Sequence, residues 1–182
     1  MSKITTKQIV FSAMAIALAT VISVAIKLPS LPNGGSTTLF SMLIICLIGF
    51  WYGPKVSIIA AIAYGILQFI VGPYVVHPLQ VILDFPLAFG ALGLSGFFAN
   101  SKHGLIKGFL VGAGGRFIVH CISGVIFYTT YVGDFVGNVS AIWAGILYNM
   151  TYIVPEVILT LILLALPPVQ KAMGELKKLA VN

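Results

Sequence analysis

Three stretches of this sequence carry polar side chains at intervals of three or four residues within otherwise apolar surroundings. They are His77, Gln80 and Asp84; Arg116, His120, Gly124 and Tyr128; and Asn149, Tyr152 and Glu156. Residues three or four apart lie on one face of an α-helix, so each stretch predicts a helix with a single polar stripe. Together the stripes offer a carboxylate, an imidazole, a carboxamide and aromatic rings. That inventory suits a polar, cationic ligand that contains a ring.

The depths of these side chains agree when each predicted helix is counted from the membrane edge at about 1.5 Å per residue. Asp84 lies roughly 10 Å below the outer edge, Asn149 about 15 Å and His120 about 16 Å. A charge at mid-helix in a bilayer costs about 2.5–3.5 kcal/mol on insertion scales and therefore requires a reason. We predict a small-molecule site in the outer half of the membrane, with Tyr128 nearer its opening.

Each of these residues also has a structural interpretation that competes with ligand binding. Asp84 is either a site carboxylate or the partner of Arg116, and the difference in depth favours the site. For His120 a ligand contact is favoured over a packing role, because it lies deep and in line with Tyr128. For Asn149 the alternative is a hydrogen bond between helices, and the two interpretations stand equal. Tyr128 alternatively belongs to the belt of aromatic residues at the membrane surface.

Arg116 and Glu156 lie deeper than the predicted site. Arg116 is about 12 Å and Glu156 about 15 Å from the cytoplasmic edge. Because unpaired burial of either charge would be expensive, we predict that the two form a structural ion pair. The two cysteines, Cys46 and Cys121, lie in apolar stretches and show no paired spacing. Neither a metal site nor a bound cofactor is therefore predicted.

The elements that must position these side chains follow from composition. Of the 182 residues, 59% are hydrophobic and 8% are charged, whereas about a quarter of a soluble domain is charged. This composition fits a bilayer as solvent, in which roughly 20 mostly apolar residues make a spanning helix. We predict an all-α membrane protein with six transmembrane helices. Their ranges are 9–26, 37–51 (a short one), 56–71, 78–98, 108–131 and 139–166, followed by a basic helical tail at 171–178.

The basic residues predict how the chain lies in a cell membrane, with an excess that gives a net charge of +6. In the six-helix arrangement Lys27 lies alone on one side. The other side holds Lys3, Lys7, Lys55, Lys102, Lys107, Lys171, Lys177 and Lys178. The positive-inside rule then places both termini in the cytoplasm, so the excess indicates orientation rather than nucleic-acid binding. Because no internal repeat is visible, residues 1–182 are predicted to form one integral membrane domain.

Motifs that would indicate other functions are absent from the sequence. It contains no G-x-x-x-x-G-K phosphate loop, no H-E-x-x-H zinc helix and no G-x-S-x-G nucleophile elbow, so an enzyme is not predicted. An autonomous secondary transporter is a weaker alternative, because such proteins commonly show two repeated halves.

Three segments together resemble the thiamin-specific S components of energy-coupling factor importers. They are His77-Pro-Leu-Gln-Val-Ile-Leu-Asp84-Phe-Pro-Leu-Ala88, Arg116-Phe-Ile-Val-His120-Cys-Ile-Ser-Gly124-Val-Ile-Phe-Tyr128 and Tyr148-Asn149-Met-Thr-Tyr152-Ile-Val-Pro155. The resemblance covers nearly the whole chain, including its length and six-helix layout. It implies high-affinity capture of thiamin from outside. It also implies import with a transmembrane coupling protein and two ATPase subunits.

Positions that match the family's motifs acquire roles through this resemblance. Asp84 corresponds to the acidic residue that would offset the thiazolium cation, and Tyr128 to the aromatic residue that stacks on a ring. The other substrate contacts predicted from the resemblance or from the polar stripes are Tyr74, Gln80, Phe85, His120, Trp143 and Asn149. The loop at 32–36 corresponds to the family's lid. Ala13 and Ala17 correspond to the docking face for the coupling protein, although small residues at this spacing also pack helices within one bundle.

Three positions depart from the family's pattern. Phe85 stands where some members have Tyr, and Ala144 stands where Tyr is expected, beside Trp143. The lid has Gly where Trp is expected. Trp143 itself is either a lid or a surface-belt aromatic. These departures make hydroxymethylpyrimidine, or another vitamin, the alternative ligand.

Overall fold

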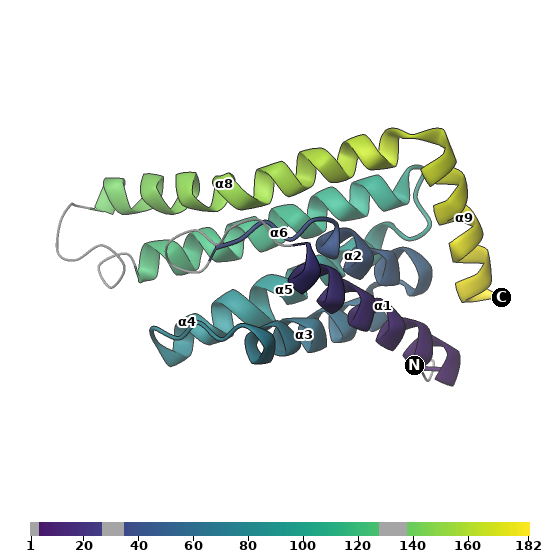
Figure 1. Cartoon of the computed structure of the whole chain (residues 1–182), viewed down its shortest axis with the longest axis horizontal. Helices are drawn as coiled ribbons and strands as arrows, with labels where there is room; N and C mark the ends of the chain where they lie inside the picture. The colour runs from purple at the N-terminus through teal and green to yellow at the C-terminus, as the bar shows by residue number, and fades with distance from the viewer. Residues whose placement is uncertain (1–3, 27–34, 128–137) are drawn as a thin grey trace.

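The computed structural model describes residues 4–26, 35–127 and 138–182, and the elements in this part of the chain are helices (Figure 1). They are α1 (Thr6–Ala25), α2 (Ser41–Tyr52), α3 (Pro54–Val71), α4 (Pro78–Ile82), η2 (Leu83–Leu87), α5 (Ala88–Gly90), η3 (Ala91–Phe98), α6 (Gly104–Ile126), α8 (Asn138–Ala165) and α9 (Pro167–Val181). Helices α6 and α8 lie side by side, whereas α9 runs across one end of the bundle (Figure 1).

Five helical stretches in the described residues are long and apolar enough to cross a membrane. They are Thr6–Ala25, Pro54–Val71, Pro78–Phe98, Gly104–Ile126 and Ile142–Ala165. This confirms an all-α protein with apolar spans, but the span predicted at 37–51 differs. Its helix, α2, has 12 residues, and residues 35–40, which lead into it, are not helical. At about 1.5 Å per residue, α2 alone is shorter than the hydrocarbon layer of a bilayer.

Local sequence signals explain where several helices begin. Helix α1 follows Thr5, whose hydroxyl accepts from the Gln8 N–H at 3.3 Å while the Gln8 side chain accepts from the Thr5 N–H at 3.0 Å. This reciprocal pair is a capping box. Pro54 and Pro78 occupy the first turns of α3 and α4, where a missing N–H is tolerated. The ring of His77 caps α4, which gives this surface histidine a structural role.

The fourth span covers the predicted range 78–98 but is not a regular α-helix. Its middle part, η2, is a π-helical turn, and its last part, η3, is a 3-10 helix. Pro86 lies inside the π turn and has no N–H to donate, so the hydrogen-bond ladder must widen around it. The Phe85 carbonyl then approaches α3 so closely that a Cβ at Gly65 would lie 2.4 Å from it. Glycine on α3 thus fixes the turn that carries Asp84.

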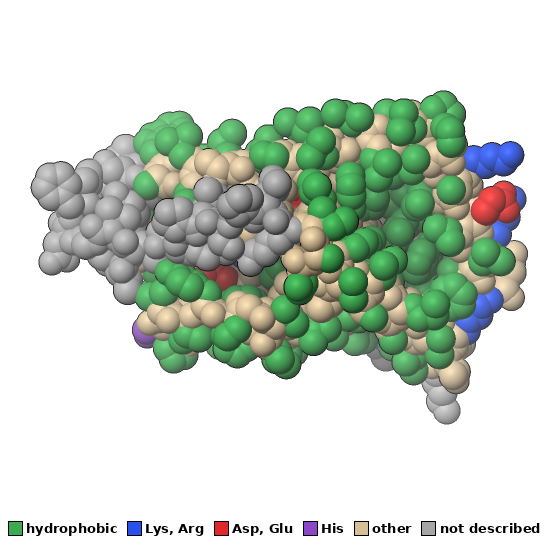
Figure 2. All heavy atoms as spheres, viewed as in Figure 1, with side chains coloured by type: hydrophobic (Ala, Val, Ile, Leu, Met, Phe, Trp, Pro, Cys, Tyr) green, Lys and Arg blue, Asp and Glu red, His purple; other side chains and the backbone are tan. Residues whose placement is uncertain are grey.

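The side chains divide into a buried core and an apolar outer surface. Ile45, Tyr64 and Phe109 are fully buried, whereas Ile118 and Ile162 are 59% and 58% exposed. Figure 2 shows apolar side chains over most of the visible face, with Lys and Arg gathered at one end. A surface of this kind suits lipid, because the helices satisfy their own backbone hydrogen bonds.

The alternating alanines of α1 lie on two different faces. Ala15 and Ala19 are buried in the core. Ala13 and Ala17 are exposed on the outer side of the helix. Internal packing therefore explains one pair of alanines but not the pair predicted to dock a partner.

Candidate functional site

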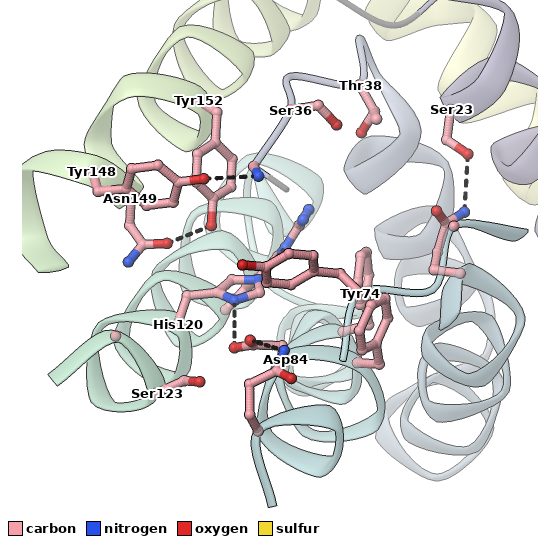
Figure 3. A pocket seen from close by; sticks show the side chains of 18 of the residues that line it. Ser23, Ser36, Thr38, Tyr74, Asp84, His120, Ser123, Tyr148, Asn149 and Tyr152 are labelled. Atoms are coloured by element: carbon pink, nitrogen blue, oxygen red, sulfur yellow. Dashed lines mark hydrogen bonds and ion pairs between the residues drawn. The ribbon is translucent and has the colours of Figure 1, made fainter. Parts of the chain in front are cut away.

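A cavity of about 550 Å³ lies between α1, α3, α4 with η2, α6 and α8 (Figure 3). Its volume falls within the range of about 300–1,000 Å³ that is usual for small-molecule sites. Its lining consists of Ser23, Val24, Gly35, Ser36, Thr38, Gln68, Val71, Gly72, Tyr74, Gln80, Asp84, Phe85, Phe89, Arg116, His120, Ser123, Gly124, Ala144, Gly145, Tyr148, Asn149 and Tyr152. Polar and aromatic side chains from several helices thus meet in one place, as the polar stripes predict.

Asp84 is held on the wall of this cavity by two side chains (Figure 3). Gln80 Nε2 donates to Asp84 Oδ2 at 2.6 Å, and His120 Nδ1 lies 3.2 Å from Asp84 Oδ1. Gln80 is itself fixed, because its Oε1 accepts from the Val76 N–H at 3.1 Å. A carboxylate has about four acceptor positions, so Asp84 retains acceptor capacity toward the cavity.

The tautomer of His120 follows from its second neighbour, Arg116. Arg116 Nε donates to His120 Nε2 at 3.3 Å. Because arginine has no acceptor, Nε2 is the unprotonated nitrogen and Nδ1–H donates to Asp84. The Arg116 guanidinium also lies 4.2 Å from the centre of the Phe89 ring, a favourable cation–π contact. His120 therefore connects a buried cation to the carboxylate of the cavity.

The structure does not bring Arg116 and Glu156 into the direct contact that was predicted. Among the described residues, no salt bridge with an N···O distance up to 4.0 Å joins the two side chains. Arg116 is engaged by His120 and by the ring of Phe89. Its charge acts on Glu156 only through space. The physical reason is that Glu156 has other hydrogen-bond partners, the Met42 N–H and the Thr38 hydroxyl.

The side chain of Glu156, a residue of α8, contacts the N-terminal end of α2. Its side chain is almost completely buried, and its Oε1 accepts from the Met42 N–H at 3.2 Å. Its Oε2 accepts from the Thr38 hydroxyl at 3.5 Å. Phe40, which precedes α2, has a left-handed backbone (φ 66°) and provides no side-chain cap. A carboxylate satisfies free N–H groups at a helix N-terminus and interacts favourably with the helix dipole, so Glu156 of α8 caps α2.

Two tyrosines that precede Glu156 on α8 hold the segment leading into α2. Tyr148 Oη accepts from the Gly35 N–H at 2.8 Å. The Tyr152 carbonyl accepts from the Thr37 hydroxyl at 3.1 Å. Tyr148, Tyr152 and Glu156 are four residues apart and share one face of α8. This face forms one wall of the cavity and fixes the segment that lies opposite it.

Asn149 is buried and lines the cavity. Its Nδ2 donates to the Gly145 carbonyl at 2.8 Å, and its Oδ1 accepts from the Tyr152 hydroxyl. Both partners belong to α8, so these bonds are not the bonds between helices that were considered as the alternative role. They hold the carboxamide in a fixed orientation at the cavity wall.

Most of the residues predicted for the site are brought together. The cavity is lined by Tyr74, Gln80, Asp84, Phe85, His120 and Asn149. Trp143 is 59% exposed on α8 and is not part of the lining. Tyr128 and residues 32–34 of the predicted lid lie outside the described residues, while Gly35 and Ser36 line the cavity.

Other lining residues were missed by the sequence reasoning. Tyr148 lies one turn before Tyr152, so the four-residue spacing that ends at Glu156 was the available signal. Ser123 is buried one turn beyond His120 on the same face of α6. The bond from Gln68 Nε2 to Ser23 Oγ, 2.9 Å long, joins α3 to α1 at the edge of the cavity and had no counterpart in the predicted stripes.

The fold and the cavity define a helical membrane protein with a polar small-molecule site. Comparison with known proteins then gives the family: the chain belongs to the thiamine transporter protein family, whose model matches residues 9–175. It is 32% identical over 152 residues to the thiamine transporter ThiT of Bacillus subtilis (strain 168), covering 75% of this chain and 77% of that relative. It is 33% identical over 89 residues to the thiamine transporter ThiT of Lacticaseibacillus paracasei, covering 40% and 44% of the two chains.

The fold is similar to a solved structure of ThiT from Listeria monocytogenes. The TM-score is 0.59 at 22% identity, and the likeness covers 89% of this chain and 93% of that chain. Membership of the family confirms the resemblance noted from the sequence. It also confirms the prediction of a membrane transporter rather than an enzyme.

Proposed function

We propose that this protein captures thiamin at the outer side of a cell membrane and delivers it for import as the substrate-binding subunit of an ATP-driven energy-coupling factor transporter. The observation that carries the proposal is Asp84, a carboxylate whose acceptor capacity faces a cavity of about 550 Å³. Thiamin carries a thiazolium cation and an aminopyrimidine ring, so it requires a negative group, hydrogen-bond partners and aromatic faces. Membership of the thiamine transporter family supports this choice of ligand.

The cavity offers each of these groups. Asp84 supplies the negative charge and accepts hydrogen bonds, as the cation and the amino group of thiamin require. Tyr74, Phe85 and Tyr148 supply aromatic side chains to the cavity lining, and a cation stacked on an aromatic face is stabilised by the ring quadrupole. The carboxamide of Asn149, already oriented by its own helix, is a further polar contact for the pyrimidine.

The membrane orientation belongs to the same proposal. The lysine-rich end of the bundle (Figure 2) faces the cytoplasm together with both termini, in accordance with the positive-inside rule. Helix α2 takes the sixth transmembrane position, although its 12 residues begin inside the bundle. The cavity then opens toward the outer side.

Import requires a source of energy that this chain does not carry, because its sequence has no phosphate-binding loop. A transmembrane coupling protein and two ATPase subunits supply that energy in the proposed assembly. The support within this chain is α1, on which Ala13 and Ala17 are exposed on one face. Small residues at four-residue spacing allow a partner helix to approach closely in lipid.

Calorimetric titration of the purified protein with thiamin, hydroxymethylpyrimidine and riboflavin tests the ligand. Asp84→Asn keeps the size of the side chain but removes its charge, and a charge-assisted contact contributes about 1.5–3 kcal/mol. We therefore expect thiamin affinity to fall tenfold or more, while the affinity for neutral hydroxymethylpyrimidine falls less. Trp143→Phe is the matched control, because Trp143 lies outside the cavity lining.

The outcomes of this titration separate the candidates. Unchanged thiamin affinity in Asp84→Asn would remove that carboxylate from the ligand site. Tighter binding of hydroxymethylpyrimidine than of thiamin by the unmodified protein would make the pyrimidine the ligand. Uptake into proteoliposomes by this chain alone, without the coupling protein, the ATPases and ATP, would instead indicate an autonomous secondary transporter.

A further inference from the structure

The C-terminal helix α9 is fixed to one end of the bundle along one of its faces. Lys177 Nζ donates to the Ala99 carbonyl at 2.6 Å and lies 4.1 Å from the centre of the Phe50 ring. The Tyr52 hydroxyl donates to the Ala180 carbonyl at 3.0 Å. These contacts hold α9 across the ends of α2 and η3, transverse to α8 (Figure 1).

The rest of α9 carries two exposed faces of opposite character. Lys171, Glu175 and Lys178 are spaced four and three residues apart and form a charged face, with a salt bridge of 3.0 Å between Glu175 and Lys178. Leu176 and Leu179, three residues apart, are 39% and 65% exposed and form an apolar face. At about 3.6 residues per turn, the apolar face lies roughly a quarter turn from both the charged face and the attached face. It therefore points sideways, in the plane across the spans.

We propose that α9 is an interfacial helix whose apolar face is covered by lipid. In this arrangement Leu176 and Leu179 enter the acyl boundary of the leaflet at the lysine-rich end. Lys171 and Lys178 bind the anionic headgroups of the same leaflet. A helix with one basic face and one apolar face, lying across the spans, has the geometry for this position.

Two observations favour lipid over another occupant. The exposed apolar surface of α8 continues to the point where α9 begins, since Ile162 and Leu166 are 58% and 48% exposed. Helix α9 thus begins where a surface that suits lipid ends, and Leu176 and Leu179 add exposed apolar side chains at the same end of the molecule. In addition, Lys and Arg gather at this end of the molecule (Figure 2), and basic residues next to a membrane attract anionic headgroups. A second copy of the chain would gain nothing from that concentration of like charge.

Spin labels test the proposal in the full-length protein, reconstituted alone in nanodiscs, with Cys46 and Cys121 replaced by alanine. Leu179→Cys and Lys178→Cys place labels on adjacent residues that belong to different faces. Collision rates are measured with oxygen, which concentrates in lipid, and with a nickel chelate, which stays in water. We expect the ratio of oxygen to nickel collisions to be several-fold higher at Leu179 than at Lys178. Leu176→Cys gives a second apolar position, which should match Leu179.

Each other result overturns the proposal. Equal or reversed ratios would place the apolar face in water. Protection of both leucine positions from both reagents would show that protein covers the face, as in a dimer. The headgroup part is tested by adding phosphatidylglycerol to phosphatidylcholine discs, which should raise the ratio at Leu179. The combined variant Lys171→Gln, Lys178→Gln should abolish that increase, and an increase that persists would exclude these two lysines as the headgroup contacts.

Discussion

Replacing Glu156 by glutamine should destabilise this protein far less than replacing it by alanine. The reason is the role of this side chain as the cap of α2. Glutamine retains a carbonyl oxygen that can accept from the Met42 N–H, which lies 3.2 Å from Glu156 Oε1. Alanine leaves that N–H without an acceptor in a buried place, since Phe40 provides no side-chain cap.

The magnitudes follow from the contacts that each substitution removes. An unsatisfied buried N–H costs about 1–3 kcal/mol, to which the alanine variant adds the loss of a packed side chain. We therefore expect Glu156→Ala to lower the free energy of unfolding by about 2–4 kcal/mol. Glu156→Gln loses mainly the interaction of a negative charge with the dipole of α2. That interaction is worth about 0.3–1 kcal/mol, rising to about 2 kcal/mol in partly buried sites.

Thermal unfolding of both variants in one detergent measures the order of these effects. Glu175→Ala is the matched control, because Glu175 is an exposed glutamate on α9 and should leave the midpoint unchanged. Equal destabilisation by glutamine and alanine would refute the capping argument, since it would show that charge alone matters. The capping argument would also fail if the double variant Arg116→Gln, Glu156→Gln were more stable than Glu156→Gln alone, because that result would indicate an ion pair between these two residues.

Three further predictions concern the cavity and the outer face of α1. A Cβ at Gly124 would lie 3.4 Å from the backbone of α8, so Gly124→Leu should abolish thiamin binding in calorimetry while Gly124→Ala retains it. Equal thiamin affinity in the two variants would place the ligand elsewhere. Tyr148→Phe removes the acceptor of the Gly35 N–H, which should weaken binding by about 1 kcal/mol, roughly fivefold, mainly through faster dissociation in stopped-flow traces. Ala13→Leu with Ala17→Leu should leave binding intact but reduce ATP-driven uptake in proteoliposomes containing the coupling protein and ATPases, and normal uptake would exclude this face as the docking surface.

The long spans and the polar stripes could be predicted from the sequence because lipid imposes strict conditions. A spanning helix requires roughly 20 apolar residues, so the ranges of the longest spans are visible in the hydropathy. A polar side chain at depth must turn away from lipid. Asp84, His120 and Asn149 therefore had to face inward, and all three line the cavity.

The hydrogen-bond partners of Glu156 could not be predicted from the sequence. Counting depth along straight spanning helices compares side chains on those helices, and it does not locate backbone N–H groups at a helix end inside the bundle. The estimated depths placed Glu156 near Arg116. Helix α2, however, begins inside the bundle and presents free N–H groups there, which the spacing of polar residues in the sequence does not reveal. The π turn at Pro86 likewise follows from a missing N–H, which changes the local geometry around Asp84. The position of Trp143 outside the cavity lining follows from its spacing along the helix. It lies six residues before Asn149, about 120° away around the helix, and so on another face of α8.

The position of Arg116 shows how the site keeps its negative charge. Its Nε–H occupies the lone pair of His120 Nε2 at 3.3 Å, where a second proton on the imidazole would have to bind. His120 thus stays neutral, and its Nδ1–H orients Asp84 without cancelling the charge of that carboxylate. Asp84 thus presents its carboxylate to the cavity, whereas Arg116 is engaged by His120 and by the ring of Phe89. A carboxylate in a medium of low dielectric is stabilised by a cation beside it. A thiazolium cation meets that requirement and a neutral pyrimidine does not, so Asp84 favours thiamin over its fragment.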